Sequence, residues 1–580
     1  MSDLQIRFAQ VDPGAKSDIV AVSAPDKSTW SVLDDLKYDN VPEPGDYATL
    51  EHNFWTLDGT KDIFPDDTTS KTWGLWTQSM SAENTYFVTA PTLDIVFNDI
   101  HKSPGFTFYF YPHTGDFARD VRITWYDAAN AVLQSGNYTF SSDFATIYEP
   151  TEGFKRISIE FLATSLPYRY IKLYGIDIGR IRIISDEEIN SCNIYEEIDP
   201  TIESISVNTF NAQIRTLEPF FSPLSNDISD EMMMKRQDFK IFQEGKRYGT
   251  FFLETWEDID NSGIVFNFEG VDAMGVLDLY TFMGGIYNNV MASDVLNEIF
   301  RIVFPTRLIK YVLDPELADA RITGWIPICT CGTAFQHIMF AINAISDTSR
   351  AGDILIYPRD TEVTYTLPLE EQYRGGNNKP TEYWSGVDVV SYNYTPGTET
   401  LEVQNGVLPV GRHEIRFSEP LHSLSIQYAT ILQSNANYAL INVTARRAVT
   451  LTGKKYVSNP RIHSVRNAIE TGETESVKSY EGYTLVNPDI GLELAESKAD
   501  YFQNRIQLED AIVLNDREVG FVVDAETRKN NFSGLITALD VNIRANKAEM
   551  TAVGKVVKRE ELGLTDYEYT GIFFSGEQGY

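Results

Sequence analysis

Apolar and polar residues alternate with a period of two in the first third of the chain, which is typical of half-buried strands. Val121, Ile123 and Trp125 share one side of their segment, and the residues between them are polar or amphipathic. Because such segments recur every 10–20 residues with turn residues between them, we predict an antiparallel β-sandwich over residues 26–178. The segments that show this pattern, or an aromatic run bounded by prolines, are 105–112, 121–127 and 156–161.

Residues 179–288 carry further strand-forming runs. Two of them, 239–242 and 249–253, flank Glu244-Gly245-Lys246, which suits a hairpin turn. We expect a small barrel-like domain here.

The apolar period changes to that of a helix between residues 289 and 360. After Ser293, a suitable N-cap, apolar residues fall at positions 295, 296, 299, 300 and 303. A second predicted helix starts near Gly332 and is apolar on nearly every side, which indicates burial. A strand at 353–357 completes this α+β domain.

Strand patterns return over residues 361–555, where one more helix is predicted at 492–505. The polar segment 461–479 is expected to be a loop or an arm. The fold class predicted is therefore mainly β with α+β parts: an N-terminal antiparallel sandwich followed by barrel-like domains with a few inserted helices. The expected organisation is a segment without regular structure at 1–25, the sandwich at 26–178, a barrel at 179–288, the α+β domain at 289–360, a second barrel at 361–555 and a tail at 556–580.

Composition supports a folded, β-rich protein. The 580 residues are 43% hydrophobic, 23% charged and 12% aromatic, and their number predicts about three to five domains. With 48 Lys and Arg against 83 Asp and Glu, the net charge is −35. Stable binding of nucleic acid is not expected, because phosphate binding needs clustered cations.

The N-terminal residues lack the basic and apolar regions of a Sec signal peptide, and no run approaches 18 apolar residues. Three cysteines do not make a disulfide scaffold. We therefore expect a protein without a transmembrane segment that folds in a reducing cytoplasm.

Catalytic signatures are missing from the sequence. It contains no phosphate-binding loop, no nucleophile elbow and no zinc-protease motif, so we assign no catalytic, cofactor or metal residue. Cys329 and Cys331 have no second cysteine pair downstream, and we interpret them as buried small residues before a helix. His337 is interpreted as a hydrogen-bonded core histidine, and acidic runs such as 186–188 as solvated loops.

Three tryptophans of the predicted sandwich are candidates for contact with a sugar ring: Trp55, Trp73 and Trp76. An exposed indole can stack on a pyranose, which would make the sandwich a glycan-binding module. The competing interpretation is that these tryptophans pack loops, and that Trp125, on an alternating face, lies in the core.

One longer segment carries a more specific pattern. Residues 325–357 contain a proline, a helical pattern of small residues with one glutamine, and then Asp347-Thr348-Ser349-Arg350 before a strand. In this order the segment resembles one in the tail proteins of phages and prophages of Gram-positive bacteria, although Gly332-Thr333 replaces the Arg-Glu pair usual there. Further strings that look like this family are 121–127, 166–172, 270–278, 281–287 and 514–520.

The resemblance covers about residues 90 to 555 and implies a structural role. Such proteins form the tail tip or baseplate hub of phages and of phage-tail-like bacteriocins: a homotrimer of barrel domains that closes the distal end of the tail tube, adapts six-fold to three-fold symmetry and opens for DNA passage or membrane puncture. It implies a non-enzymatic virion component, assembled in the bacterial cytoplasm, whose partners are the tube or distal tail protein and fibre, spike or other baseplate proteins. The alternative is a receptor-binding minor tail protein that recognises cell-surface carbohydrate through the sandwich.

Overall fold

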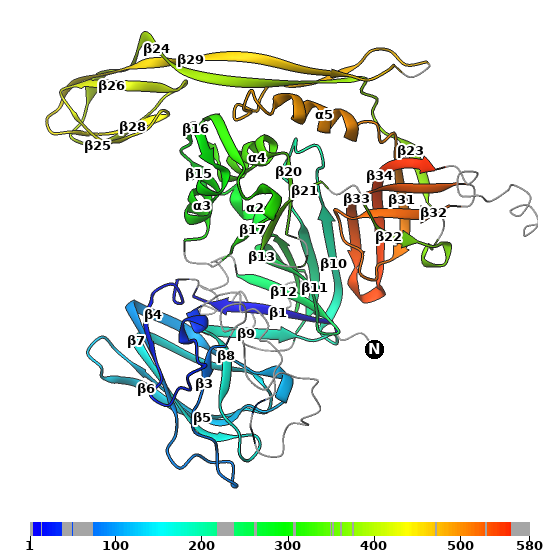
Figure 1. Cartoon of the computed structure of the whole chain (residues 1–580). Coiled ribbons are helices and arrows are strands. Elements are labelled where there is room, and N and C mark those ends of the chain that lie inside the picture. The colour runs from blue at the N-terminus through cyan, green and yellow to red at the C-terminus, as the bar shows by residue number, and fades with distance from the viewer. Residues whose placement is uncertain are drawn as a thin grey trace, which may run out of the picture. The chain divides into compact units, whose positions relative to one another are not determined.

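The computed structural model confirms that the chain is mainly β, with several antiparallel sheets and few helices (Figure 1). It describes residues 4–12, 14–37, 49, 51, 73–216, 237–259, 264–305, 309–348, 350, 353–359, 362–373, 376–469, 472–527 and 530–557. The predicted tail lies outside these residues from position 558 on. Within the described part, no helix has the length and apolar character needed to cross a membrane.

The chain divides into two compact units. Unit 1 consists of Met1–Asn190, Gln213–Gly270 and Phe304–Ile309, and unit 2 of Ser191–Ala212, Val271–Val303 and Lys310–Tyr580. The domain limits expected from the sequence stay a prediction.

The first sheet of unit 1 is antiparallel and contains the strands expected for the sandwich, drawn in blue to cyan in Figure 1. Its two longest strands, β4 and β7, shift register between Val96 and Gly105 of β4, and such irregularities bend a sheet. The strands are β2 (Ile19–Ser23), β3 (Leu75–Trp76), β4 (Thr92–Phe110), β5 (Ala118–Tyr126), β6 (Val132–Thr139), β7 (Phe144–Thr164) and β8 (Lys172–Asp177).

A large hydrophobic core packs against this sheet. Phe97 before the bend of β4 and Phe108 after it belong to the same cluster of buried side chains. The alternation seen in the sequence is confirmed, because Val121, Ile123 and Trp125 of β5 are all buried in that cluster.

The second sheet of unit 1 corrects the expectation for residues 1–25. This segment was predicted to lack regular structure, but Leu4–Val11 forms strand β1, which pairs antiparallel with β9 (Gly179–Ile184) and β12 (Asp238–Gln243). Leu4, Ile6 and Phe8 alternate into the core. Within unit 1 this sheet also contains β13 (Lys246–Asp258) and β14 (Val265–Val271), and it is part of a 13-stranded sheet that includes strands of unit 2.

The predicted hairpin in this sheet is confirmed. Strands β12 and β13 pair antiparallel, and the turn between them has positive φ at both Glu244 (51°) and Gly245 (78°). Positive φ at both turn residues matches the twist of a two-residue hairpin, and glycine adopts it without steric cost.

The division between the two units falls within β10 (Ile189–Glu197) and β11 (Thr209–Arg215). Unit 2 contains the α-helices of the described residues. Helices α3 (Ala292–Val303) and α4 (Cys331–Ile342) occupy the predicted positions, α4 being buried on most sides. A short helix, α2 (Ala273–Leu277), precedes them. Small sheets lie around the helices: β15 (Thr281–Phe282) with β19 (Cys329–Thr330), β16 (Gly285–Met291) with β18 (Arg321–Ile326), and β17 (Tyr311–Leu313) with β21 (Ile354–Pro358) and β20 (Ala344–Asp347).

A C-terminal sheet follows in the order β23-β31-β34-β33-β10, with β32 pairing β33 and β22. Helix α5 (Gly491–Tyr501) begins one residue before the predicted position and ends four residues earlier than predicted. The strands are β22 (Val363–Leu367), β23 (Asn377–Pro380), β31 (Ile506–Val513), β32 (Val522–Glu526), β33 (Asn531–Asn542) and β34 (Lys547–Val557).

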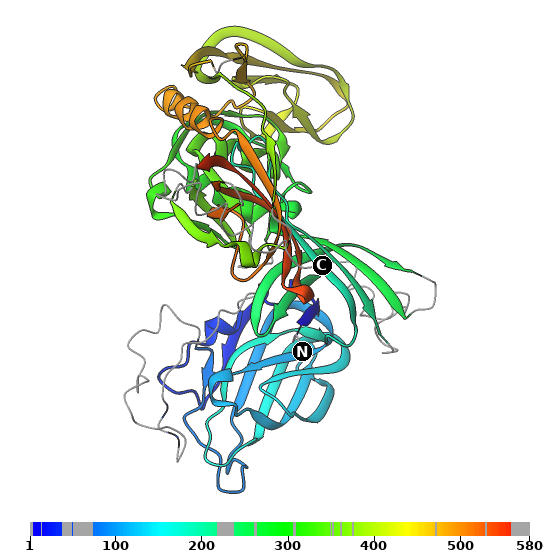
Figure 2. The ribbon, with the colours of Figure 1, turned by 90° about the vertical axis from the view of Figure 1, so that its right-hand side faces the viewer.

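Residues 386–466 form a β-arm, called the arm below. Two long strands, β24 (Gly386–Leu408) and β29 (Arg447–Arg466), pair antiparallel along their length (Figures 1 and 2). The prediction of a loop or arm over 461–479 was partly wrong, because β29 runs to Arg466 and β30 (Val477–Tyr480) pairs β24. The shorter strands of the arm are β25 (Gly411–Arg416), β26 (Leu421–Gln427), β27 (Thr430–Ser434) and β28 (Tyr438–Val443).

A buried ion triad lies beside the core of the first sheet. The Nζ of Lys172 is 2.8 Å from a carboxylate oxygen of Glu51 and 2.9 Å from one of Asp116, and all three side chains are almost fully buried. Breaking such a buried group by removing one partner leaves uncompensated charge.

Replacing Lys172 by Met is expected to lower the free energy of unfolding of unit 1 by about 3–5 kcal/mol, because two buried carboxylates lose their cation. Urea unfolding followed by circular dichroism measures it. The control is Arg122→Met, which removes an exposed ion pair with Glu160 and is expected to cost under about 1 kcal/mol. Equal effects of the two substitutions would contradict this account.

Candidate functional site: a buried polar junction in unit 2

The segment that carries the tail-protein pattern folds into β18, β19, α4, β20 and β21. Thr330 caps α4 by accepting a hydrogen bond from the Thr333 N–H at 3.0 Å, and Asn343 ends it in the left-handed region at φ 53°. The small residues Ala334, Ala341 and Ala344 are buried. This pattern therefore marks close packing around the helix.

The residues after β20 form a buried polar corner. The Nδ2 of Asn208 donates to Asp347 at 3.4 Å and to the Oγ1 of Thr348 at 3.2 Å. Thr348 donates in turn to Asp272. Asp272 also accepts the N–H groups of Met274 and Gly275 and so caps α2. Each buried polar group here thus has a partner, as burial requires.

Arg350 extends this corner toward the C-terminal part of the chain. Its Nε and Nη2 lie 3.1 Å and 3.3 Å from the two carboxylate oxygens of Glu196, a two-pronged pairing. Its Nη2 also donates to the carbonyl oxygen of Arg517 at 2.7 Å, and its Nη1 lies 3.5 Å from Glu518. Two separate strings of the resemblance, 347–350 and 514–520, therefore meet at one guanidinium. Ser349 lies outside the described residues.

The electrostatics of this junction fit a framework. Burial raises the pKa of Asp272 to about 6, against the hydrogen bonds that favour its charged form. Burial also raises the pKa of Glu196, and the guanidinium of Arg350 opposes that shift. The carboxylates are occupied by a helix cap and an ion pair, so the arrangement holds these segments of the chain together.

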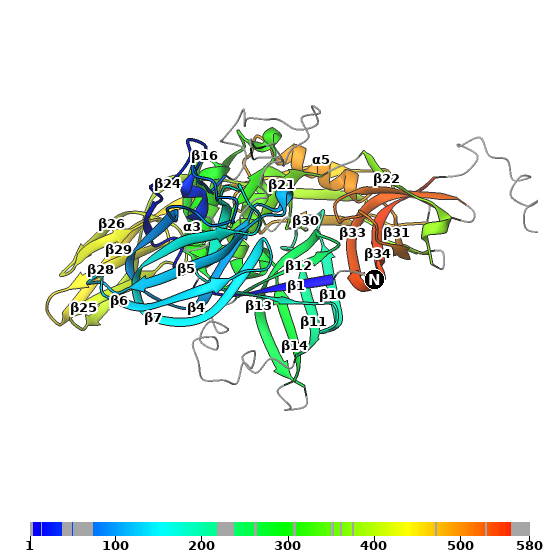
Figure 3. The same cartoon turned by 90° about the horizontal axis from the view of Figure 1, so that it is seen from below.

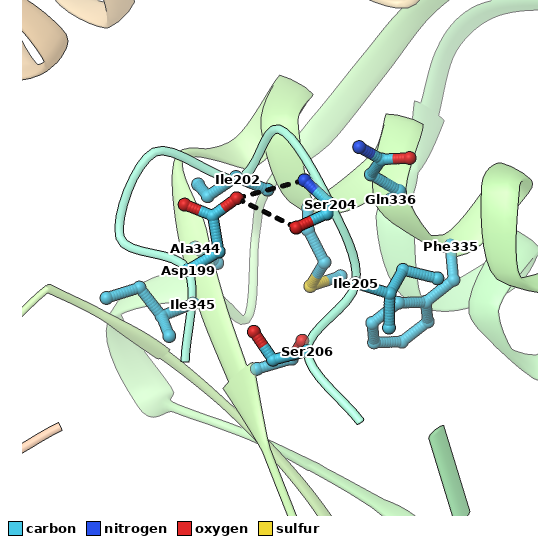
Figure 4. A pocket seen from close by; sticks show the side chains of 11 residues that line it. Asp199, Ile202, Ser204, Ile205, Ser206, Phe335, Gln336, Ala344 and Ile345 are labelled. Carbon is cyan, nitrogen blue, oxygen red and sulfur yellow. Dashed lines mark hydrogen bonds between the residues drawn. The ribbon is translucent and has the colours of Figure 1, made fainter. Parts of the chain in front are cut away.

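A small hollow opens next to the junction, between the loop 199–206 and helix α4 (Figure 4). Asp199 accepts hydrogen bonds there from the backbone N–H of Ser204 at 3.0 Å and from its hydroxyl at 3.1 Å. The cavity volume of about 10 Å³ is close to what one water needs, and too small for a substrate.

The structure corrects the glycan candidates. Trp73 and Trp76 are 2% and 3% exposed and pack with Tyr111 in a separate cluster, so neither indole offers a face to a sugar ring. Trp55 lies outside the described residues. Trp125 is a core residue, as the competing interpretation held.

Among the described residues, the two cysteines and His337 have no contacts that suggest a reaction. Cys331 is buried, Cys329 is partly exposed, and both are free thiols whose pKa burial raises. His337 is partly buried against Tyr483, and its Nδ1 has no hydrogen-bond partner in the described part of the chain, so the interpretation as a hydrogen-bonded histidine was wrong there. Among the described residues no group of three His, Cys, Asp or Glu could hold a metal.

Sequence reasoning did not identify Lys498 of α5, which is buried next to α4. Its Nζ lies 5.2 Å from the centre of the Phe340 ring. Burial lowers the pKa of Lys498 from 10.5 to about 7, although Asp199 and Glu203 oppose the shift. An ammonium in this apolar setting costs stability whenever it is charged.

Arg350→Met is expected to destabilise unit 2 by about 3–5 kcal/mol, because Glu196 stays buried without its cation. The matched control is Arg416→Met, whose pair with Glu414 is exposed and contributes under about 1 kcal/mol. Urea unfolding of both variants gives the comparison, and a near-zero effect of Arg350→Met would count against the framework role.

Lys498→Met is expected to stabilise the protein at pH 7. Between the folded pKa of about 7 and the unfolded pKa of 10.5 the unfolded chain binds more protons, so wild-type stability rises with pH in that window, by up to about 1.4 kcal/mol per unit. The advantage of the Met variant should therefore shrink between pH 7 and pH 9 in urea unfolding. A constant advantage across this range would show that Lys498 does not titrate as described.

Neither a protein-family model nor a curated protein sequence matches the chain. Solved structures that are similar to part of it include the following three. A 43 kDa tail protein of prophage MuSo2 from Shewanella oneidensis is 11% identical over 65% of this chain and 96% of that one, with a TM-score of 0.38. The prophage tail protein gp18 from Listeria monocytogenes is 10% identical over 68% and 97%, with a TM-score of 0.36.

The third structure is the E. coli protein c3393, a component of the type VI secretion system described as similar to bacteriophage T4 tail proteins. It is 10% identical over 64% of this chain and 73% of that one, with a TM-score of 0.31. With TM-scores below 0.5, these similarities are too weak to assign the chain to a family.

Proposed function

We propose that the chain is a structural component of a phage or phage-tail-like particle, and that it forms a trimeric hub at the distal end of the tail tube. The observation that carries the proposal is the convergence at Arg350. Two strings that resemble tail proteins, far apart in sequence, supply its side chain and one of its acceptors, the carbonyl oxygen of Arg517. Two chance resemblances would have no reason to meet at one buried ion pair. Their contact is what we expect if both strings belong to one common structural unit of tail proteins.

The chemistry of the described residues agrees with a structural role. The buried carboxylates of the junction hold a helix cap and an ion pair, and the hollow beside them has room for about one water. A net charge of −35 would let DNA pass a central opening without adhering, because like charges repel. The partners proposed are the tube or distal tail protein on one side and fibre, spike or other baseplate proteins on the other.

The alternative is a receptor-binding protein that uses the sandwich to bind carbohydrate. Two of the three tryptophans proposed as sugar contacts, Trp73 and Trp76, are buried. Trp73 and Trp76 would have to leave their cluster with Tyr111 to meet a sugar. We therefore place the hub first.

A hub of this kind is expected to be a trimer, since a three-fold tip needs three copies. The purified full-length protein should have a light-scattering mass three times the chain mass of 65.6 kDa. A monomer at every concentration and salt tested would contradict the proposed hub.

A further inference from the structure

The arm carries a charge opposite to that of the chain as a whole. Residues 386–466 contain eight Lys and Arg but five Asp and Glu, an excess of three positive charges. The chain has a net charge of −35, so the residues outside the arm carry −38. A basic segment in an acidic protein is drawn to the surface of other copies.

The outer part of the arm has its own hydrophobic core. Strands β25, β28 and β27 form one sheet, and it packs against β26, β29 and β24 (Figure 3). Leu421, Ile441 and Leu451 are among the residues buried between the two sheets. The packed core holds the ends of these strands in place and so positions the turns that connect them.

Strand register brings three turns together at one end of this core. Leu408 lies opposite Arg447 and Gly411 opposite Val443, so the turns 408–411 and 443–447 are neighbours. Thr430 lies opposite Asn442, which adds the turn 427–430. We call residues 407–412, 427–430 and 443–447 the loop end of the arm.

The loop end exposes apolar and basic side chains together. Val407, Val410 and Tyr428 are each about three-fifths exposed, and the Arg447 guanidinium lies 5.4 Å from the centre of the Tyr428 ring. Arg412 and Arg446 are also exposed. Within the described residues, none of these three arginines has a carboxylate partner.

Three of the five cations elsewhere in the arm have a carboxylate partner, and one of these three is Arg416 with Glu414. Lys455 lies 3.1 Å from Glu399 and 3.0 Å from Glu419, and Arg466 lies 2.7 Å from Asp388. Four arginines of the arm have no carboxylate partner among the described residues. Three of them lie at the loop end, where the exposed valines and tyrosine also lie, and the fourth is Arg461 of β29.

We propose that the loop end of the arm is a docking surface for an acidic face of a second copy of this chain. Tyrosine, arginine and exposed apolar residues in one patch are the composition of protein interfaces, whereas a surface for a phosphate polymer would not need the valines. The charge of −38 outside the arm supplies the complement. The proposal deepens the proposed function, because it names a surface through which the hub would assemble.

The test reverses two charges of the loop end in the full chain, Arg446→Glu with Arg447→Glu. The matched control, Lys454→Glu with Arg461→Glu, makes the same charge change at two exposed positions of β29. Lys454 is the closer of the two to the loop end, and it lies seven residues, or about 23 Å, along the strand from Arg447. Light scattering over a concentration series gives the association constant of each protein at low and high salt.

We expect the loop-end variant to associate at least about tenfold more weakly than wild type, the control to change little, and the difference to shrink in high salt. A wild-type trimer that both variants retain would overturn this proposal and leave the hub standing. A wild-type monomer would overturn both. The proposal would also be overturned, in favour of a polyanion as the partner, if the loop-end variant associated as wild type does but lost binding to inorganic polyphosphate.

Discussion

Unit 2 depends on the guanidinium of Arg350. A buried cation must be paired, and this one is paired with Glu196 and with the carbonyl oxygen of Arg517, which come from strand β10 and from the segment after β31. Its neighbour Thr348 reaches Asp272, the cap of α2. These buried polar and charged groups thus fix four parts of the chain, far apart in sequence, relative to one another. Separating them would leave buried charges without partners, at a large cost in folding free energy.

Much of the fold could be predicted because its signals are local. The alternation of Val121, Ile123 and Trp125 predicted the inward face of β5, and the helical period of the apolar residues located α3 and α4. The predicted cap of α3 was wrong, because Ser293 lies inside that helix. The arm was harder to predict, because Pro396 and Gly397 suggest that a strand ends there. In the structure they lie where the register of β24 shifts, and a strand tolerates proline and glycine at such an irregularity. Strand β1 alternates as clearly as β5, but its partners lie about 170 and 230 residues away.

The candidate site could be predicted only in part. The pattern around Asp347 and Arg350 marked the segment, but nothing local in the sequence names Glu196, 154 residues away, as the partner. Exposure is equally a tertiary property, and for that reason the sequence alone could not decide whether Trp73 and Trp76 face a ligand or pack loops. The Lys172 triad and the buried Lys498 left no signal, because a single charged residue in a mixed sequence normally indicates a solvated position.

Buried ion pairs and helix caps hold unit 2 together, and the basic arm is the surface proposed for assembly. In the proposed hub, three copies of the chain form a ring around an opening. Negative-stain class averages of the purified full-length protein test this most directly. A hub of this kind gives a three-fold particle with a central opening, and averages that show only single chains or a closed two-fold dimer would rule it out.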